Sequence, residues 1–236
     1  RLEELLGEAT GLMAAGQARE AETLIDRVLQ QDEEHVQALE LKADLLQRRQ
    51  DWPALPPVLE RLADMAFDAA LTLAYTRERA LVLEEHLGDR EAAALVWARY
   101  LDWEPLDDEA FERLSTWYLE QESWLELADL HGSRAAAAWE RLGDAGHSPG
   151  LQMAARQGYL EEARLRLFQQ NDPSAAVVAA DAGLQVAEDD PELLEIQVRG
   201  LALTNQREAC RDAIDRLMPQ LVDGPLKDEM VLLRGN

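Results

Sequence analysis

The stretch that decides the fold is Gly88-Asp-Arg-Glu-Ala-Ala-Ala-Leu-Val-Trp-Ala-Arg-Tyr-Leu-Asp-Trp-Glu-Pro105. Gly88 tolerates the left-handed backbone that ends a helix. Asp89 offers a side-chain oxygen to the free N–H groups at the start of the next helix. Ala93 and Trp97 follow at the four-residue spacing of one helical stripe, and Pro105 closes the segment. The segment therefore predicts a tight turn followed by an amphipathic helix.

The same pattern recurs along the chain. Adding 72 to Gly16, Ala21 and Trp52 gives Gly88, Ala93 and Trp124, and a shorter period of 34 relates Asn171 to Asn205. The residues at the predicted turns are Gly16, Gln50, Gly88, Glu122, Asn171 and Asn205. Asp172 and Ser123, like Asp89, are predicted to cap the helix that follows. No stretch alternates polar and apolar residues over the length of a strand, so the chain is predicted to be all-α.

These units resemble a known family. A 34-residue helix–turn–helix unit with an early alanine in its second helix and a closing proline is similar to the tetratricopeptide repeat, in the form of the tandem arrays of bacterial proteins. The resemblance covers nearly the whole chain. It implies a right-handed α-α superhelix (a solenoid) of about six helix hairpins, each with a helix A and a helix B, plus a C-terminal helix.

The period also predicts the domain organisation. Two spacings depart from it: Leu55 to Ala93 is four residues longer than one repeat, and Leu127 to Ala176 is fifteen residues longer. We expect longer helices and a loop at these places. The predicted parts are repeats one to four in residues 1–142, a turn-rich loop and helix start that forms a hinge in 143–156, and repeats five and six plus the terminal helix in 157–236.

Composition excludes several classes of function. The chain has 23 basic and 47 acidic residues, a formal net charge of −24, which repels nucleic acid and anionic lipid. No apolar run approaches the roughly 20 residues of a membrane span. A lone cysteine, Cys210, excludes an intramolecular disulfide framework, and we expect it to fill a small core position of helix B. The 21 arginines against 2 lysines indicate a GC-rich, bacterial genome; the cytoplasm is favoured over the periplasm.

Two local patterns suggest chemistry without supporting it. Gly146–Gly150 matches G-x-S-x-G, but Pro149 follows the serine and has no N–H for an oxyanion hole. Glu85, His86 and Asp89 would lie at one helix end, where exposed charges are more common than a metal site. We therefore expect no catalytic residue, no metal and no cofactor, and a hydrolase or metalloprotein is the least supported function.

The resemblance implies that a partner segment binds to the helix-A side chains of the concave face. By register these are Glu40, Asp44, Gln47, Tyr75, Glu78, Glu85, Glu109, Glu112, Thr116, Glu161, Leu165, Glu195 and Arg199. Most of the charged ones are carboxylates. Such a face either is simply solvated or attracts a basic partner segment.

The predicted function is a non-catalytic protein–protein interaction or scaffold module with an acidic concave groove. The alternative is a regulatory or assembly arm of a larger multidomain bacterial protein, either an enzyme or an envelope-associated protein. Trp97 is predicted to lie in the core, whereas Trp103, Trp117 and Trp139 become contact candidates where they are exposed. A dimer is expected if the C-terminal helix leaves its apolar residues Leu226, Met230 and Leu233 without a partner.

Overall fold

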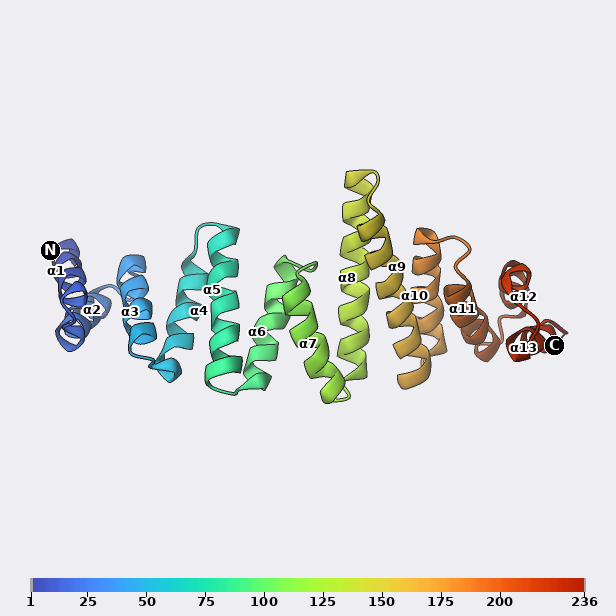
Figure 1. Cartoon of the computed structure of the whole chain (residues 1–236), viewed down its shortest axis with the longest axis horizontal. Coiled ribbons are helices and arrows are strands. Elements are labelled where there is room, and N and C mark those ends of the chain that lie inside the picture. The colour runs from blue at the N-terminus through green and yellow to red at the C-terminus, as the bar shows by residue number, and fades with distance from the viewer. Residues whose placement is uncertain (1, 236) are drawn as a thin grey trace. The chain divides into compact units, whose positions relative to one another are not determined.

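The computed structural model describes residues 2–235, which form helices and turns with no strand among them (Figure 1). The chain divides between Glu104 and Pro105 into two compact units. Unit 1 contains α1 (Leu2–Ala14), α2 (Ala18–Gln31), α3 (Val36–Arg48), η1 (Trp52–Ala54), α4 (Leu55–Met65), α5 (Ala69–Leu81), η2 (Val82–His86) and α6 (Arg90–Trp103). Unit 2 contains α7 (Asp108–Glu120), α8 (Trp124–Ala145), α9 (Pro149–Arg164), η3 (Leu165–Gln169), α10 (Pro173–Val186), α11 (Pro191–Leu203), α12 (Arg207–Leu217), η4 (Met218–Gln220) and α13 (Pro225–Gly235).

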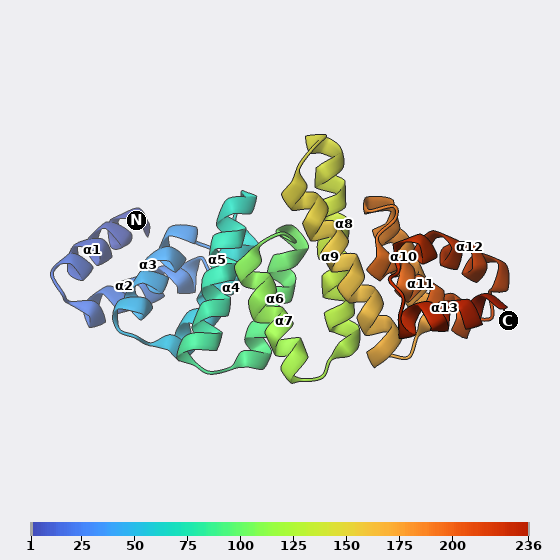
Figure 2. The same ribbon diagram turned by 45° about the vertical axis from the view of Figure 1, so that its right-hand side comes forward.

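Successive helices of each unit pack as antiparallel neighbours (Figures 1 and 2). The hairpins of unit 1 are α1–α2, α3–α4 and α5–α6, and those of unit 2 are α7–α8, α9–α10 and α11–α12, with α13 packed on α12. The prediction of an all-α chain of six hairpins plus a terminal helix is confirmed for the described residues. None of the helices within residues 2–235 is both long and apolar enough to cross a membrane.

All six predicted turn residues adopt the left-handed backbone. Their φ angles are 77° at Gly16, 56° at Gln50, 67° at Gly88, 53° at Glu122, 54° at Asn171 and 57° at Asn205. In every hairpin the next helical element begins two residues later. This conformation directs backbone N–H groups to the last carbonyls of helix A, as when Gln17 N–H donates to Leu12 O at 2.9 Å.

Side-chain caps complete some of these turns. Asp89 and Asp172 accept hydrogen bonds from the backbone N–H groups of Ala92 and Ala175, at 3.0 and 2.9 Å, as predicted. The predicted cap at Ser123 is wrong, because its side chain makes no capping hydrogen bond. The start of α8 is held there by the carbonyl of Ser123, which accepts from Leu127 N–H at 3.0 Å.

The core repeats at fixed distances from each turn. Five residues after the turn stand Ala21, Leu55, Ala93, Leu127, Ala176 and Cys210, and all six are buried. The small core position predicted for Cys210 is therefore confirmed, and so is burial of Trp97, nine residues after Gly88. Four of the six residues five positions after the turn are alanine or cysteine, which lets helix B approach its partner closely in those hairpins.

In the fourth hairpin, polar side chains stand nine and twelve residues after the turn residue Glu122. His131 and Arg134 are half-buried there, both against Phe111 of α7. The His131 and Phe111 rings meet edge to face with centroids 5.2 Å apart, and the guanidinium of Arg134 lies 4.5 Å from the Phe111 centroid. Burial lowers the pKa of His131, so this packing favours the neutral imidazole.

Two of the A helices end in a π turn. Leu87 N–H donates to Val82 O and Gln170 N–H donates to Leu165 O, both at 3.1 Å and both five residues back. A π turn accommodates one extra residue within a helix. Accordingly, the fully buried Ala80 lies eight positions before its turn residue, whereas Ala9 lies seven positions before Gly16.

The turn-rich stretch predicted at 143–156 is narrower than expected. Residues 143–145 complete the 22-residue α8, and only 146–148 lie outside helices before Pro149 starts α9. Proline suits this first helical position because its fixed φ matches the helix and its missing N–H would have no partner. The division into two compact units falls at Glu104/Pro105, and the predicted bounds of the repeat groups stay a prediction. A hinge at 143–156 stays a prediction.

The C-terminal helix corrects one expectation. Met230 of α13 is fully buried, and Leu226 and Leu233 pack partly buried against the core that α11 and α12 share. These three residues therefore have a partner within the chain. The premise of the predicted dimer, an uncovered apolar face formed by these residues, is wrong.

Replacing the turn residue Gln50 by glycine should stabilise the protein. A non-glycine residue in the left-handed region costs about 1–2 kcal/mol, part of which glycine recovers despite its greater freedom in the unfolded chain. We expect Gln50→Gly to raise the urea midpoint of unfolding. Asn205→Gly is the control and should change the midpoint less, since asparagine tolerates this conformation. An equal or lower midpoint for Gln50→Gly would contradict the strain assigned to this turn.

Adding one methyl group at Gly158 should destabilise the contact between α8 and α9. A Cβ there would lie 2.8 Å from both the Ala135 Cβ and the His131 carbonyl oxygen. Such overpacking costs about 1–3 kcal/mol. Gly7→Ala is the matched helical control, since its Cβ would meet nothing within 4 Å, and it should stabilise α1 by up to about 1 kcal/mol. Thermal unfolding of both variants checks the contrast, and equal shifts would refute it.

Candidate functional site

Five of the predicted site residues gather on the A helices of unit 1. Glu40, Asp44 and Gln47 lie on one side of α3 at spacings of four and three residues, and Tyr75 and Glu78 lie three residues apart on α5. These five residues are called the α3–α5 acidic face below. They belong to two successive hairpins, so the face depends on how those hairpins stack.

Two hydrogen bonds join the helices across this face. The Tyr75 hydroxyl donates to Glu40 Oε1 at 3.1 Å, and Gln47 Nε2 donates to Glu78 Oε1 at 2.8 Å. Their partners are 35 and 31 residues apart in the sequence, about one repeat. The structure therefore brings together residues that the sequence placed on one face by register alone.

The electrostatics of the face are those of weakly compensated carboxylates. Burial raises the pKa of Glu78, against the opposing effect of the Gln47 hydrogen bond. Burial also raises the pKa of Tyr75, and the hydrogen bond and charge of Glu40 and the charge of Glu78 act in the same direction. Each shift has the sign expected where negative charge is poorly solvated.

One cation compensates part of this charge. Arg48 Nε lies 2.8 Å from Asp44 Oδ1, in an i,i+4 pair on α3. The Arg48 side chain is 62% exposed, and pairs of this kind contribute only a few tenths of a kcal/mol. Glu85, the sixth predicted residue of this unit, lies further along in η2 and is exposed. The Asp44–Arg48 pair leaves the carboxylates of Glu40 and Glu78 to set the charge of the face.

The predicted residues of unit 2 form no comparable cluster. Glu109, Glu161 and Glu195 each pair with an arginine of the same helix, at 3.1, 2.9 and 2.9 Å, through Arg113, Arg164 and Arg199 respectively. Arg199 also bonds Glu229 of α13 at 2.8 Å. The other predicted residues are Glu112 and Thr116, which are exposed, and Leu165, which is half-buried in η3. Three of the four predicted glutamates of this unit thus each have an arginine partner on their own helix.

A cavity in unit 1 was missed by the sequence reasoning. It measures about 270 Å³, lies between α4, α5 and α6, and is lined by Glu60, Asp64, Arg79, Tyr100 and Trp103 among others. Arg79 pairs with Glu60 at 2.8 Å, but its Nε is buried without a hydrogen-bond partner. The four extra residues between Leu55 and Ala93 indicate a change in this hairpin. They lengthen its first helix, because α5 starts more residues before its turn residue Gly88 than α3 does before Gln50.

Exposed aromatic side chains lie at and near this cavity. Trp103 is 59% exposed, and Phe67, in the α4–α5 connection, is 89% exposed. Trp139 of unit 2 is 37% exposed, whereas Trp117 is partly buried and less exposed than Trp139. The expectation that Trp103 and Trp139 are available for contacts therefore stands as a proposal.

The two patterns that suggested chemistry have structural roles. Ser148 is the N-cap of α9, where its side-chain oxygen accepts from Leu151 N–H at 3.5 Å. His86 stacks on Trp52, with ring centroids 3.7 Å apart. Among residues 2–235 no three metal-ligating side chains converge.

The geometry of the hairpins defines the type of fold. Six hairpins share a left-handed turn residue, a second helix that starts two residues later and a buried residue five positions after the turn. The six hairpins repeat one helix–turn–helix unit, which is the architecture that the resemblance to the tetratricopeptide repeat implies.

Comparison with known proteins found similar solved structures only. No family model and no curated protein matches the sequence. A type IV pilus biogenesis factor, PilW, is 13% identical, with 98% of both chains covered and a TM-score of 0.36. A tetratricopeptide repeat protein from Parabacteroides merdae is 13% identical, with 100% and 99% covered and a TM-score of 0.40. YrrB, described as a tetratricopeptide repeat protein with an unusual peptide-binding site, is 13% identical, with 80% and 88% covered and a TM-score of 0.39.

The raised pKa of Glu78 predicts how stability depends on pH. A carboxyl group whose pKa is higher in the folded state destabilises that state as pH rises through its ordinary value of 4.5, and the penalty is complete above the raised value. Glu78→Gln removes the charge and keeps an acceptor for Gln47. We expect the variant to melt higher than the parent at pH 7, with a gain that shrinks as pH falls toward 4.5.

Glu112→Gln is the control for loss of one negative charge. Glu112 is exposed on α7 and belongs to the same set of predicted residues. Thermal melts of the parent and both variants from pH 7 to pH 5 make the comparison. A pH-independent gain for Glu78→Gln, or an equal pH-dependent gain for Glu112→Gln, would be inconsistent with a desolvated carboxylate at Glu78.

Proposed function

We propose that this chain is a non-catalytic protein-interaction module whose α3–α5 acidic face binds a basic segment of a partner protein. The observation that carries the proposal is the pair of contacts Tyr75–Glu40 and Gln47–Glu78. They fix one glutamate on each of two hairpins, and the exposed Arg48 pairs with Asp44 instead of with either of them. Arginine or lysine side chains of a partner would supply the missing positive charge.

Rigidity supports this reading. The hydrogen bonds of Tyr75 and Gln47 fix both glutamates before a partner arrives, so little side-chain entropy remains to be lost on binding. The net charge of −24 adds long-range attraction for a basic segment and raises its rate of encounter. Three of the predicted glutamates of unit 2 pair with arginines, so their charge is less available to a partner than that of Glu40 and Glu78.

The contact is expected to be partly apolar as well. Exposed aromatic side chains such as Trp103 and Phe67 give affinity that does not depend on salt. A regulatory or assembly arm of a larger bacterial protein would use the same acidic face, so one binding experiment tests both descriptions of the chain.

The test measures binding of labelled peptides by fluorescence anisotropy. We expect an Arg/Ala peptide to bind and a Glu/Ala peptide of equal length not to bind. Raising the salt to about 0.5 M should weaken binding, because the Debye length falls well below 10 Å. The double variant Glu40→Gln/Glu78→Gln should lose about 1–2 kcal/mol, or roughly 5- to 30-fold in affinity.

The matched control is Glu20→Gln/Glu34→Gln. It removes two exposed carboxylates of unit 1 that lie outside the α3–α5 acidic face. The control should retain most of the affinity. Equal losses in the two double variants would reduce the effect to net charge, and salt-independent binding or binding of the acidic peptide would reject the proposal.

A further inference from the structure

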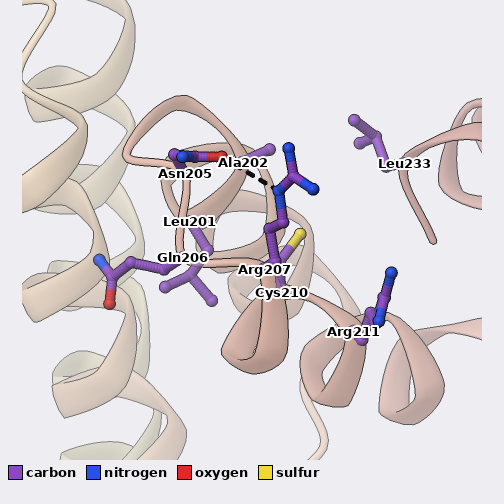
Figure 3. Close-up of a pocket in the computed structure, with 8 residues that line it drawn as sticks. All are labelled: Leu201, Ala202, Asn205, Gln206, Arg207, Cys210, Arg211 and Leu233. Carbon is purple, nitrogen blue, oxygen red and sulfur yellow. Dashed lines mark hydrogen bonds between the residues drawn. The ribbon is translucent and has the colours of Figure 1, made fainter. Parts of the chain in front are cut away.

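A second cavity lies in unit 2, where α11, α12 and α13 meet. It measures about 220 Å³ and has an apolar part formed by Leu201, Ala202, Cys210 and Leu233. Arg207 and Arg211 of α12 also line it. Figure 3 shows both arginine side chains extending from α12 on the side where Leu233 of α13 lies. The cavity thus combines an apolar interior with a cationic rim.

The two arginines have no carboxylate contact at this rim. Arg207 Nε donates to the amide oxygen of Asn205 at 3.3 Å, and no hydrogen bond or ion pair of Arg211 is found among residues 2–235. The two arginines are four residues apart on the helix, a spacing at which like charges repel each other weakly. Most other arginines of unit 2 do contact carboxylates, including Arg156, Arg166 and Arg199.

The acids nearest in sequence lie elsewhere. Glu208 and Asp212 belong to α12 but do not line the cavity, and Asp215 pairs with Arg234 at 2.8 Å. Glu208 and Asp215 lie three and four residues from Arg211 on the helix, but neither forms a hydrogen bond or ion pair with it among residues 2–235, and neither lines the cavity. Two arginines and no carboxylate line the cavity, in a chain with twice as many acids as bases.

We propose that this cavity binds an organic carboxylate joined to a short apolar group. The apolar group would fill the space between Leu201, Ala202, Cys210 and Leu233, and the carboxylate would accept hydrogen bonds from the guanidinium groups of Arg207 and Arg211. Guanidinium groups bind carboxylates with charge-assisted hydrogen bonds, often in pairs. Small-ligand sites have this composition: a mostly apolar lining with few polar groups that fix orientation. The site is independent of the α3–α5 acidic face.

Octanoate is the first probe, and octanol is its uncharged counterpart. Titrations followed by methyl NMR and calorimetry should show saturable binding of octanoate, with shifts at the Leu201, Ala202 and Leu233 methyl groups. Octanol should bind at least about tenfold more weakly, because it lacks the charge that the guanidinium groups recognise. Equal affinity for octanol, or octanoate binding without a shift at these methyl groups, overturns the proposal.

Variants test the arginines. Arg207→Gln/Arg211→Gln should weaken octanoate at least about tenfold, whereas Arg19→Gln/Arg27→Gln, which removes two exposed arginines of α2, should leave binding unchanged. All four positions are exposed, and circular dichroism verifies that both variants fold. Retained affinity in Arg207→Gln/Arg211→Gln rejects the site.

A short peptide ending in leucine, tested as the free acid and as the amide, identifies the source of the carboxylate. Binding of the free acid but not of the amide supports a polypeptide C-terminus as ligand. Binding of neither octanoate nor the free-acid peptide refutes the proposal.

Discussion

The rest of the structure depends on one backbone constraint, the left-handed residue that ends each helix A. It lets the chain reverse in two residues while the last carbonyls of the helix still find N–H donors. Because the second helix always starts at the same distance from this residue, the positions that face the first helix are fixed as well. The core positions five and nine residues after the turn follow from that geometry.

The same constraint places the interaction surfaces. Helix A of one hairpin and helix A of the next come close enough for Tyr75 to reach Glu40, about one repeat away in sequence. A binding face in such an array is therefore a property of two adjacent hairpins. Charge within one hairpin is decided more locally, by arginines three or four residues from each glutamate, as in the pairs of Glu161 and Glu195.

The sequence was sufficient for the features that repeat. The turn residues and the burial of Cys210 followed from the 34-residue period, since local conformation and core volume both repeat with it. The ion pairs of the predicted glutamates in unit 2 follow from a sequence spacing, because Glu109 and Arg113, and likewise Glu195 and Arg199, are four residues apart on one helix. The cavity beside Trp103 could not be predicted from the period. The spacing from Leu55 to Ala93 shows that residues are inserted, but not whether they extend a helix or a loop. The failed cap at Ser123 depended on a side-chain rotamer that no pattern records.

The π turn of η2 changes how the register should be counted. Glu40 and Glu78 both lie ten residues before their turn residues, so the period treats them as equivalent. The extra residue in η2 keeps Ala80 in the core but rotates the preceding residues by about 100° relative to the turn. Glu40 stays exposed, whereas Glu78 turns partly inward and meets Gln47. The extra residue in η2 thus leads to a raised pKa for Glu78, through its burial. In this way, repeats of one array can acquire different chemistry without a change in fold.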